Sequence, residues 1–128
     1  MVREHMSVPS ILIAEDEGLI ALHLQESLEK AGYNALDPVS SGEDVIEYVN
    51  AHAHPDLIIM DISLDGKLDG IGTAREIRKR FDIPIIFLSA HTEEKRLAGA
   101  EDLAPFGFLG KPFALSELIL TVEKALGR

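Results

Sequence analysis

The sequence predicts an α/β fold in one domain, a doubly wound parallel sheet built from five successive strand–helix units. Three observations lead to this prediction. Short apolar runs without polar alternation recur along the chain, as parallel strands covered on both faces require. The segments between them carry apolar residues at helical spacing. A length of 128 residues suits one domain with its own core, which we place at residues 10–128 behind a flexible arm at residues 1–9.

The predicted strands are the apolar runs and one weaker segment that contains Pro38. They cover residues 10–14, 33–39, 57–60, 85–88 and 106–109. Because proline has no N–H to donate to a neighbour, Pro38 confines the second strand to an edge of the sheet. Together with right-handed crossovers, this favours the strand order 2-1-3-4-5. In that order the first and third strands are neighbours, and the crevice where ligands bind such sheets lies between their carboxyl ends.

The predicted helices follow the strands in turn and present one apolar face each. They cover residues 17–31, 44–51, 71–81, 92–103 and 115–126. Gly32 ends the first helix, and the Ser41-Gly42-Glu43-Asp44 segment opens the second. In the last helix, apolar residues recur three or four positions apart from Leu115 to Leu126, which predicts that this helix packs on the sheet.

The composition excludes several classes of function. A net charge of −10 argues against direct binding to nucleic acid or to anionic membranes. No apolar run approaches the ~18 residues of a membrane-spanning helix, and no secretion signal is recognisable. The absence of cysteine excludes disulfides and thiolate metal sites, and it suits the cytoplasmic location that we expect.

Polar residues with distinctive chemistry end four of the predicted strands. Glu15 and Asp16 follow the first, Asp61 the third, Ser89 the fourth and Lys111 the fifth. Parallel strands bring these ends together, and neighbouring carboxylates repel each other unless a cation offsets them. Mg²⁺ or Mn²⁺ suits such oxygen ligands, and the lysine and hydroxyl would suit a phosphoryl group. A carboxylate can itself attack phosphorus and form an aspartyl phosphate.

This set of motifs resembles the receiver domain of bacterial two-component response regulators. The resemblance covers residues 10–126 and also includes Asp69-Gly70 at the start of the third helix. It implies the flavodoxin-like version of the fold. Each motif is weak alone, whereas all of them together, in this order and at these strand ends, make a strong pattern.

The resemblance assigns a role to each site residue. It implies that Asp61 accepts the phosphoryl group and that Asp16 binds the metal directly, with Glu15 beside it and the backbone carbonyl of Ser63 as a further ligand. The remaining roles concern signal transmission: Ser89 is the switch hydroxyl, Lys111 senses the phosphoryl group, Phe108 is the switch aromatic, and Lys111-Pro112 is a cis peptide.

Three features depart from the family pattern. Phe108 lacks the hydroxyl that a tyrosine would carry. The loop at residues 63–70 contains no proline and is one residue longer than usual. The first acidic position holds Glu15 rather than the commoner aspartate, and its longer arm would suit metal binding through water.

The leading hypothesis is therefore a signalling module switched by phosphorylation. The resemblance implies a sensor histidine kinase or a histidine phosphotransfer protein as the phosphodonor, slow hydrolysis of the acyl phosphate, and a downstream output domain or protein that reads the fourth helix, fifth strand and fifth helix. It also allows a homodimer, and either a stand-alone module or a receiver from a longer regulator or kinase.

Two other classes of function stay open. A phosphatase or phosphotransferase would use Asp61 as a turnover nucleophile, but such enzymes often carry a second aspartate where this chain has Ser63. An interaction module that is never phosphorylated, or a flavin binder, would use the same fold. The Glu15-Asp16-Glu17 run disfavours the flavin binder, because it repels phosphate after the first strand.

Overall fold

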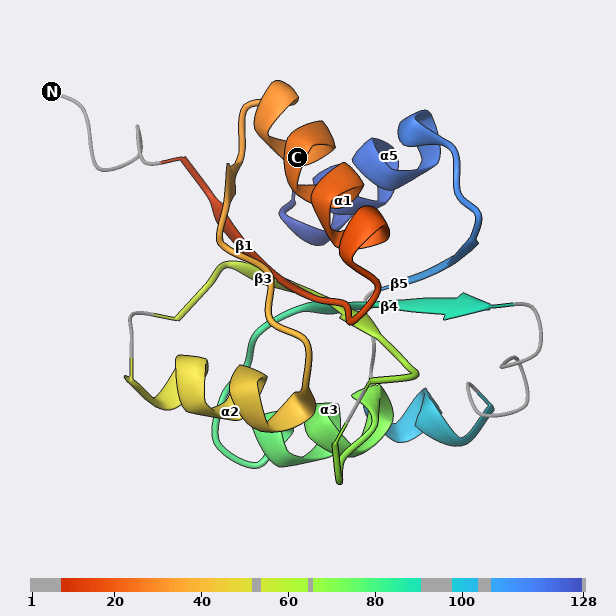
Figure 1. Cartoon of the computed structure of the whole chain (residues 1–128). Coiled ribbons are helices and arrows are strands. Elements are labelled where there is room, and N and C mark those ends of the chain that lie inside the picture. The colour runs from red at the N-terminus through yellow and green to blue at the C-terminus, as the bar shows by residue number, and fades with distance from the viewer. Residues whose placement is uncertain (1–7, 52–53, 65, 91–97, 104–106, 128) are drawn as a thin grey trace, which may run out of the picture.

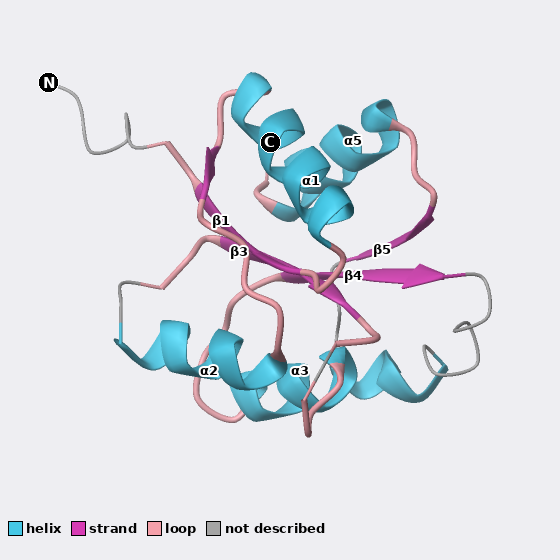
Figure 2. Ribbon diagram, viewed as in Figure 1, coloured by secondary structure: helices cyan, strands magenta, loops and turns pink. Residues whose placement is uncertain are grey.

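The computed structural model describes residues 8–51, 54–64, 66–90, 98–103 and 107–127. Most of the predicted arm at residues 1–9 lies outside them. Within the described residues, five parallel strands form one sheet in the order β2-β1-β3-β4-β5 (Figure 1). Helices cover both faces of this sheet (Figure 2). The predicted fold class and strand order are confirmed.

Three of the four main strands include the polar residue that the sequence places at their end, and the first stops just before Glu15. The four are β1 (Ser10–Ala14), β3 (Leu57–Asp61), β4 (Ile85–Ala90) and β5 (Gly107–Lys111). The last three run past their predicted ends, because the ladder continues through Asp61 opposite Leu88 and through Lys111 opposite Ala90. Asp61 and Lys111 are therefore held by strand hydrogen bonds.

The second strand is shorter than predicted. Only β2 (Asn34–Ala35) pairs continuously with β1, and an isolated bridge joins Val39 to Ala14 further along. The interruption includes Pro38, which has no N–H to donate. The predicted place of this strand at the edge of the sheet is confirmed.

Two helical layers enclose the sheet. The helices α1 (Gly18–Lys30) and α5 (Leu115–Ala125) cover one face, and α2 (Gly42–Ala51), α3 (Gly70–Arg78) and η3 (Ala98–Leu103) cover the other (Figure 1). Each face buries its own apolar cluster, with Leu24, Leu28 and Leu118 on the first side. The strands of the sheet centre are buried on both faces, as their unbroken apolar runs predict.

The fourth helix differs from the prediction. The described part, Ala98–Leu103, is a 3₁₀ helix, and residues 91–97 lie outside the described residues. Short 3₁₀ segments are common connectors, and Gly99 within this one lowers its α-helical propensity. Its buried Ala100 and Leu103 still join the core beside α3.

Candidate functional site

Alternation along the strands decides which side chains meet at the carboxyl edge of the sheet. Ile13, Ile59 and Leu109 all face the α1 and α5 layer. Two residues further on, the same face carries Glu15, Asp61 and Lys111. Asp61 and Lys111 are thereby directed to one place by their own strands, and Glu15 by the position that directly follows β1.

Three carboxylates converge at this edge. Oxygen atoms of Glu15, Asp16 and Asp61 all lie within 4.8 Å of one another. Glu15 is only 3% exposed and Asp61 only 1%, whereas Asp16 is half-buried. The predicted neighbours β1 and β3 supply all three groups, so the acidic residues lie at the point where the strand order reverses.

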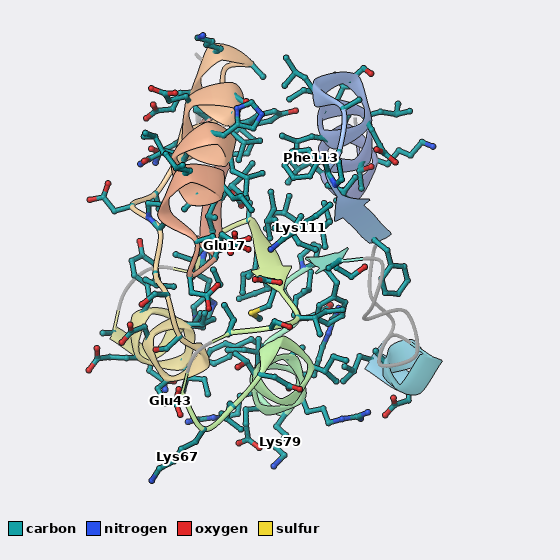
Figure 3. All side chains as sticks on the ribbon, turned by 45° about the vertical axis from the view of Figure 1, so that its right-hand side comes forward. Glu17, Glu43, Lys67, Lys79, Lys111 and Phe113 are labelled. Carbon is teal, nitrogen blue, oxygen red and sulfur yellow. The ribbon has the colours of Figure 1, made fainter. Side chains whose placement is uncertain are left out.

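Lys111 supplies the positive charge among these carboxylates. Its Nζ atom lies 2.7 Å from Glu15 Oε1, 3.1 Å from Asp61 Oδ2 and 3.6 Å from Glu17 Oε1. The peptide bond to Pro112 is cis. Lys111 and Glu17 lie at the same edge in Figure 3. The Lys111 ammonium therefore lies within hydrogen-bonding distance of Asp61.

Burial dominates the electrostatics of the two enclosed carboxyl groups. The pKa of Glu15 is raised to about 7, chiefly by burial and in smaller part by the nearby Asp61 charge, against the lowering effect of Lys111 and the Glu17 N–H. Burial also raises the pKa of Asp61, while Lys111 and the Ser63 N–H oppose that rise. Although burial opposes it, the carboxylates of Glu15 and Asp61 raise the pKa of Lys111. One ammonium group leaves the three carboxylates short of positive charge.

The donor set fits a hard divalent cation. All the side-chain ligands that the cluster offers are carboxylate oxygens, which Mg²⁺ and Mn²⁺ prefer. Glu15 Oε1 is buried and has no well-aligned hydrogen bond among the described residues, although Lys111 Nζ lies close to it. A buried acceptor of this kind is stabilised by a metal ion, by a bound water or by a proton.

The loop after β3 begins against Asp61. The Ser63 N–H donates to Asp61 Oδ1 at 3.2 Å, which orients the carboxylate from its own loop. Gly70, at the start of α3, donates to the Ile62 carbonyl at 2.8 Å. A Cβ atom at residue 70 would lie 2.1 Å from the Asp61 carbonyl oxygen, so only glycine permits this approach. Asp69 caps α3 through Gly72 N–H at 2.7 Å.

Ser89 and Phe108 belong to the opposite face of the sheet. Phe87 packs in the α2 and α3 layer, and Ser89, two residues later, is 5% exposed. Phe108 lies across from Phe87, with ring centroids 6.1 Å apart and ring planes 20° from parallel. Its side chain is 44% exposed, so Phe108 is at the surface and is not enclosed in the core.

A cavity of about 590 Å³ adjoins the charged cluster between α1 and the segment after β5. Lys111 and Glu17 border it on one side, and Leu19, Ile20 and Phe113 give it an apolar lining. Leu19 is 85% exposed. The sequence reasoning missed the contact of Glu17 with Lys111; the unbroken acidic run from Glu15 to Glu17 was the available signal.

Comparison with known proteins agrees with this geometry. The chain matches the response regulator receiver domain family over residues 11–123. It is 37% identical over 118 residues to the transcriptional regulatory protein PdtaR of Mycobacterium tuberculosis, covering 92% of this chain and 57% of PdtaR. It is 38% identical over 123 residues to the transcriptional regulatory protein BaeR of Escherichia coli, covering 95% of this chain and 50% of BaeR. The chain thus spans about half the length of these relatives.

Solved structures give the same result. The signal receiver domain of a modulated diguanylate cyclase from Desulfovibrio desulfuricans superposes with a TM-score of 0.86 at 34% identity, over 94% of this chain and 95% of that one. The N-terminal domain of a response regulator, sensory box and GGDEF protein from Carboxydothermus hydrogenoformans gives 0.85 at 36% identity, over 92% and 94%. The chain belongs to the receiver domain family of two-component response regulators. No described helix has both the length and the apolar character to cross a membrane.

Proposed function

We propose that this receiver domain accepts a phosphoryl group on Asp61 from the phosphohistidine of a sensor kinase or a histidine phosphotransfer protein. The convergence of Asp61 with Lys111, 3.1 Å away, and with two further carboxylates is the observation that carries the proposal. An oxygen of Asp61 attacks phosphorus, the P–N bond to the donor imidazole breaks, and the donor nitrogen keeps the electron pair. The product is an acyl phosphate on Asp61.

Asp16, Asp61 and Glu15 would hold the divalent cation, and the backbone carbonyl of Ser63 completes the proposed protein ligands. When bound, Mg²⁺ or Mn²⁺ offsets negative charge on the transferring phosphoryl oxygens. Lys111 is already within reach of Asp61 Oδ2, so it needs only to exchange that carboxylate for a phosphoryl oxygen. Ser89 alternates to the opposite face of the sheet, but it stands at the same carboxyl edge, one residue beyond the partner of Asp61 in the β3–β4 ladder. Its hydroxyl would have to reach the phosphoryl group around that edge.

The proposed phosphodonor docks over the cavity between α1 and Phe113. Lys111 borders both this cavity and the carboxylate cluster, so a protein seated on the apolar lining would present its histidine beside Asp61. Leu19 is exposed. A docked protein would bury it, whereas a small phosphodonor would not. Replacement of Leu19 by alanine is expected to slow transfer from a kinase and to leave labelling by acetyl phosphate unchanged.

The proposed output surface comprises η3, β5 and α5. The phosphoryl group on Asp61 would add negative charge beside Lys111, the last residue of β5, and the response would pass along that strand to exposed Phe108. A downstream domain or protein would read this surface. The same proposal places the chain in the cytoplasm, with hydrolysis of its own acyl phosphate as the only expected turnover.

Labelling with a small phosphodonor tests the acceptor assignment. The wild-type protein with Mg²⁺ and acetyl phosphate is expected to gain one phosphoryl group by intact mass, in an adduct that hydroxylamine cleaves. Asp61→Asn should remove the adduct, and Asp44→Asn on exposed α2 is the matched control. Undiminished labelling of Asp61→Asn would exclude Asp61 as the acceptor, and repeated release of phosphate without a stable adduct would favour the phosphatase alternative.

A further inference from the structure

The loop between β3 and α3 is anchored to the acceptor at both of its ends. At the start, the Ser63 N–H donates to Asp61 Oδ1. At the end, Gly70 packs so closely on the Asp61 carbonyl that no side chain fits there. Both ends of the loop therefore touch Asp61, so a change in the loop that reaches either end would alter the surroundings of the acceptor.

Glu43, on a different element, holds the centre of this loop. The Lys67 N–H donates to Glu43 Oε2 at 3.0 Å. Gly66 has a φ of +96°, and a Cβ atom there would lie 2.5 Å from Glu43 Oε1. The chain therefore turns tightly around the carboxylate in a conformation that favours glycine. Glu43 and Lys67 lie at the same corner of the molecule in Figure 3.

The Glu43 carboxylate bridges two segments rich in backbone donors. Its pKa is lowered by its own backbone N–H at the start of α2, and also by hydrogen bonds from the N–H groups of Lys67 and Leu68. Hydrogen bonds to an ionised acceptor are stronger than those between neutral groups. The carboxylate therefore joins the first turn of α2 to the loop.

The start of α2, beside Glu43, packs closely on the loop and on α3. A Cβ atom at Gly42 would lie 1.9 Å from Thr73 Oγ1 and 3.1 Å from the Leu68 carbonyl oxygen. The start of α2 is thus seated directly on the loop and on α3. The loop itself contains no proline that would restrict its backbone.

We infer that Glu43 is a positioning residue for the phosphoryl-accepting site: its carboxylate holds the loop after Asp61, and thereby the Ser63 backbone, in the conformation that the site uses. This inference rests on the proposed function of Asp61. Glu43 acts through the loop backbone and is not itself a metal ligand. The competing explanation is that Glu43 only stabilises the first turn of α2, as acidic residues at helix starts commonly do.

Amide hydrogen exchange in the metal-free protein separates the two explanations. Glu43→Ala should accelerate exchange of the Lys67 amide by at least about threefold, because opening of the loop would then break no ionic hydrogen bond. Glu43→Gln, which keeps one acceptor oxygen, should give a smaller change. Glu47→Gln, one turn further along the exposed side of α2, is the matched control. Faster exchange in α2 alone, with Lys67 unchanged, would overturn the inference.

Metal binding and labelling then test the consequence for the site. Titration with Mg²⁺ followed by NMR should show weaker binding by Glu43→Ala, by about three- to tenfold, which is less than the loss when a direct partner of a metal ligand is removed. Labelling by acetyl phosphate should slow at low Mg²⁺ and recover at saturating Mg²⁺. Unchanged Mg²⁺ affinity with a released Lys67 amide would refute the positioning role. Failure of the wild-type protein to become labelled would refute the proposed function. The wild-type measurement therefore separates a failure of the proposed function from a failure of the positioning role of Glu43.

Discussion

Replacement of Glu15 by glutamine should make the metal-free protein more stable at neutral and mildly alkaline pH. Glu15 is buried beside Asp61, and burial is the main reason that its pKa rises from 4.5 to about 7. A group whose pKa is higher in the folded state than in the unfolded chain binds protons more tightly when folded. The stability that proton binding by Glu15 adds is therefore complete below pH 4.5 and is lost as the pH rises through about 7.

The size of the effect follows from the difference between the two pKa values. Each unit corresponds to about 1.4 kcal/mol, so a rise from 4.5 to about 7 gives about 3 kcal/mol between mildly acidic and alkaline pH. Glutamine does not titrate, and it keeps one oxygen for Lys111 or for the Glu17 N–H, which now donates to Glu15 Oε2 at 2.9 Å. The contact that glutamine cannot keep, with either Lys111 or the Glu17 N–H, costs about 1 kcal/mol of this gain in stability. We expect Glu15→Gln to gain about 2 kcal/mol at pH 8.

Urea denaturation followed by far-UV circular dichroism provides the measurement, since the chain has no tryptophan for fluorescence. Wild-type protein in EDTA should lose stability from pH 5 to pH 8. Glu15→Gln should lose much less, with a remaining slope from Asp61, whose pKa is raised in the same direction. Glu26→Gln on the exposed side of α1 should behave as wild type. A wild-type stability that is constant or increasing over this range, with no gain in Glu15→Gln, would refute the reasoning.

Three further predictions concern neighbouring residues. Asp16→Ala should weaken Mg²⁺ binding by at least about tenfold in an NMR titration, and an unchanged affinity would remove Asp16 from the proposed ligands. Lys111→Ala should retain some labelling of Asp61 but lose the accompanying NMR shifts in β5 and α5; if those shifts persist, Lys111 does not sense the phosphoryl group. Gly70→Ala should lower the free energy of unfolding by about 1–3 kcal/mol, because its methyl group would meet the Asp61 carbonyl. Gly110→Ala is its control in the same urea experiment, since an added Cβ there meets no described atom within 4 Å.

The strand order and the place of the charged residues were predictable because they follow from local patterns. Continuous apolar runs require a sheet covered on both faces, and Pro38 requires an edge. Parallel strands bring their carboxyl ends together, so Glu15, Asp61 and Lys111 were expected to meet before any distance was known. The residue pattern also favoured a hard cation, since it offered oxygen ligands and no cysteine.

Other features depended on packing between distant segments. The second strand is short because only Asn34 and Ala35 pair continuously with β1. Phe108 is exposed on the edge strand β5, although Phe87, across from it on the same face of the sheet, is buried. The raised pKa of Glu15 required burial that no sequence pattern measures.

The sequence by itself determined which residues form strands and which chemistry stands at their ends, because periodicity and residue type act over a few neighbouring positions. The tertiary structure alone decided that Glu17 also approaches Lys111, and that Glu43 reaches the Lys67 backbone 24 residues away. The physical reason is that such contacts depend on how separate elements are seated against one another. That seating is set by close packing of the whole core, as at Gly42 and Gly70, where the space beside the backbone is too small for a methyl group.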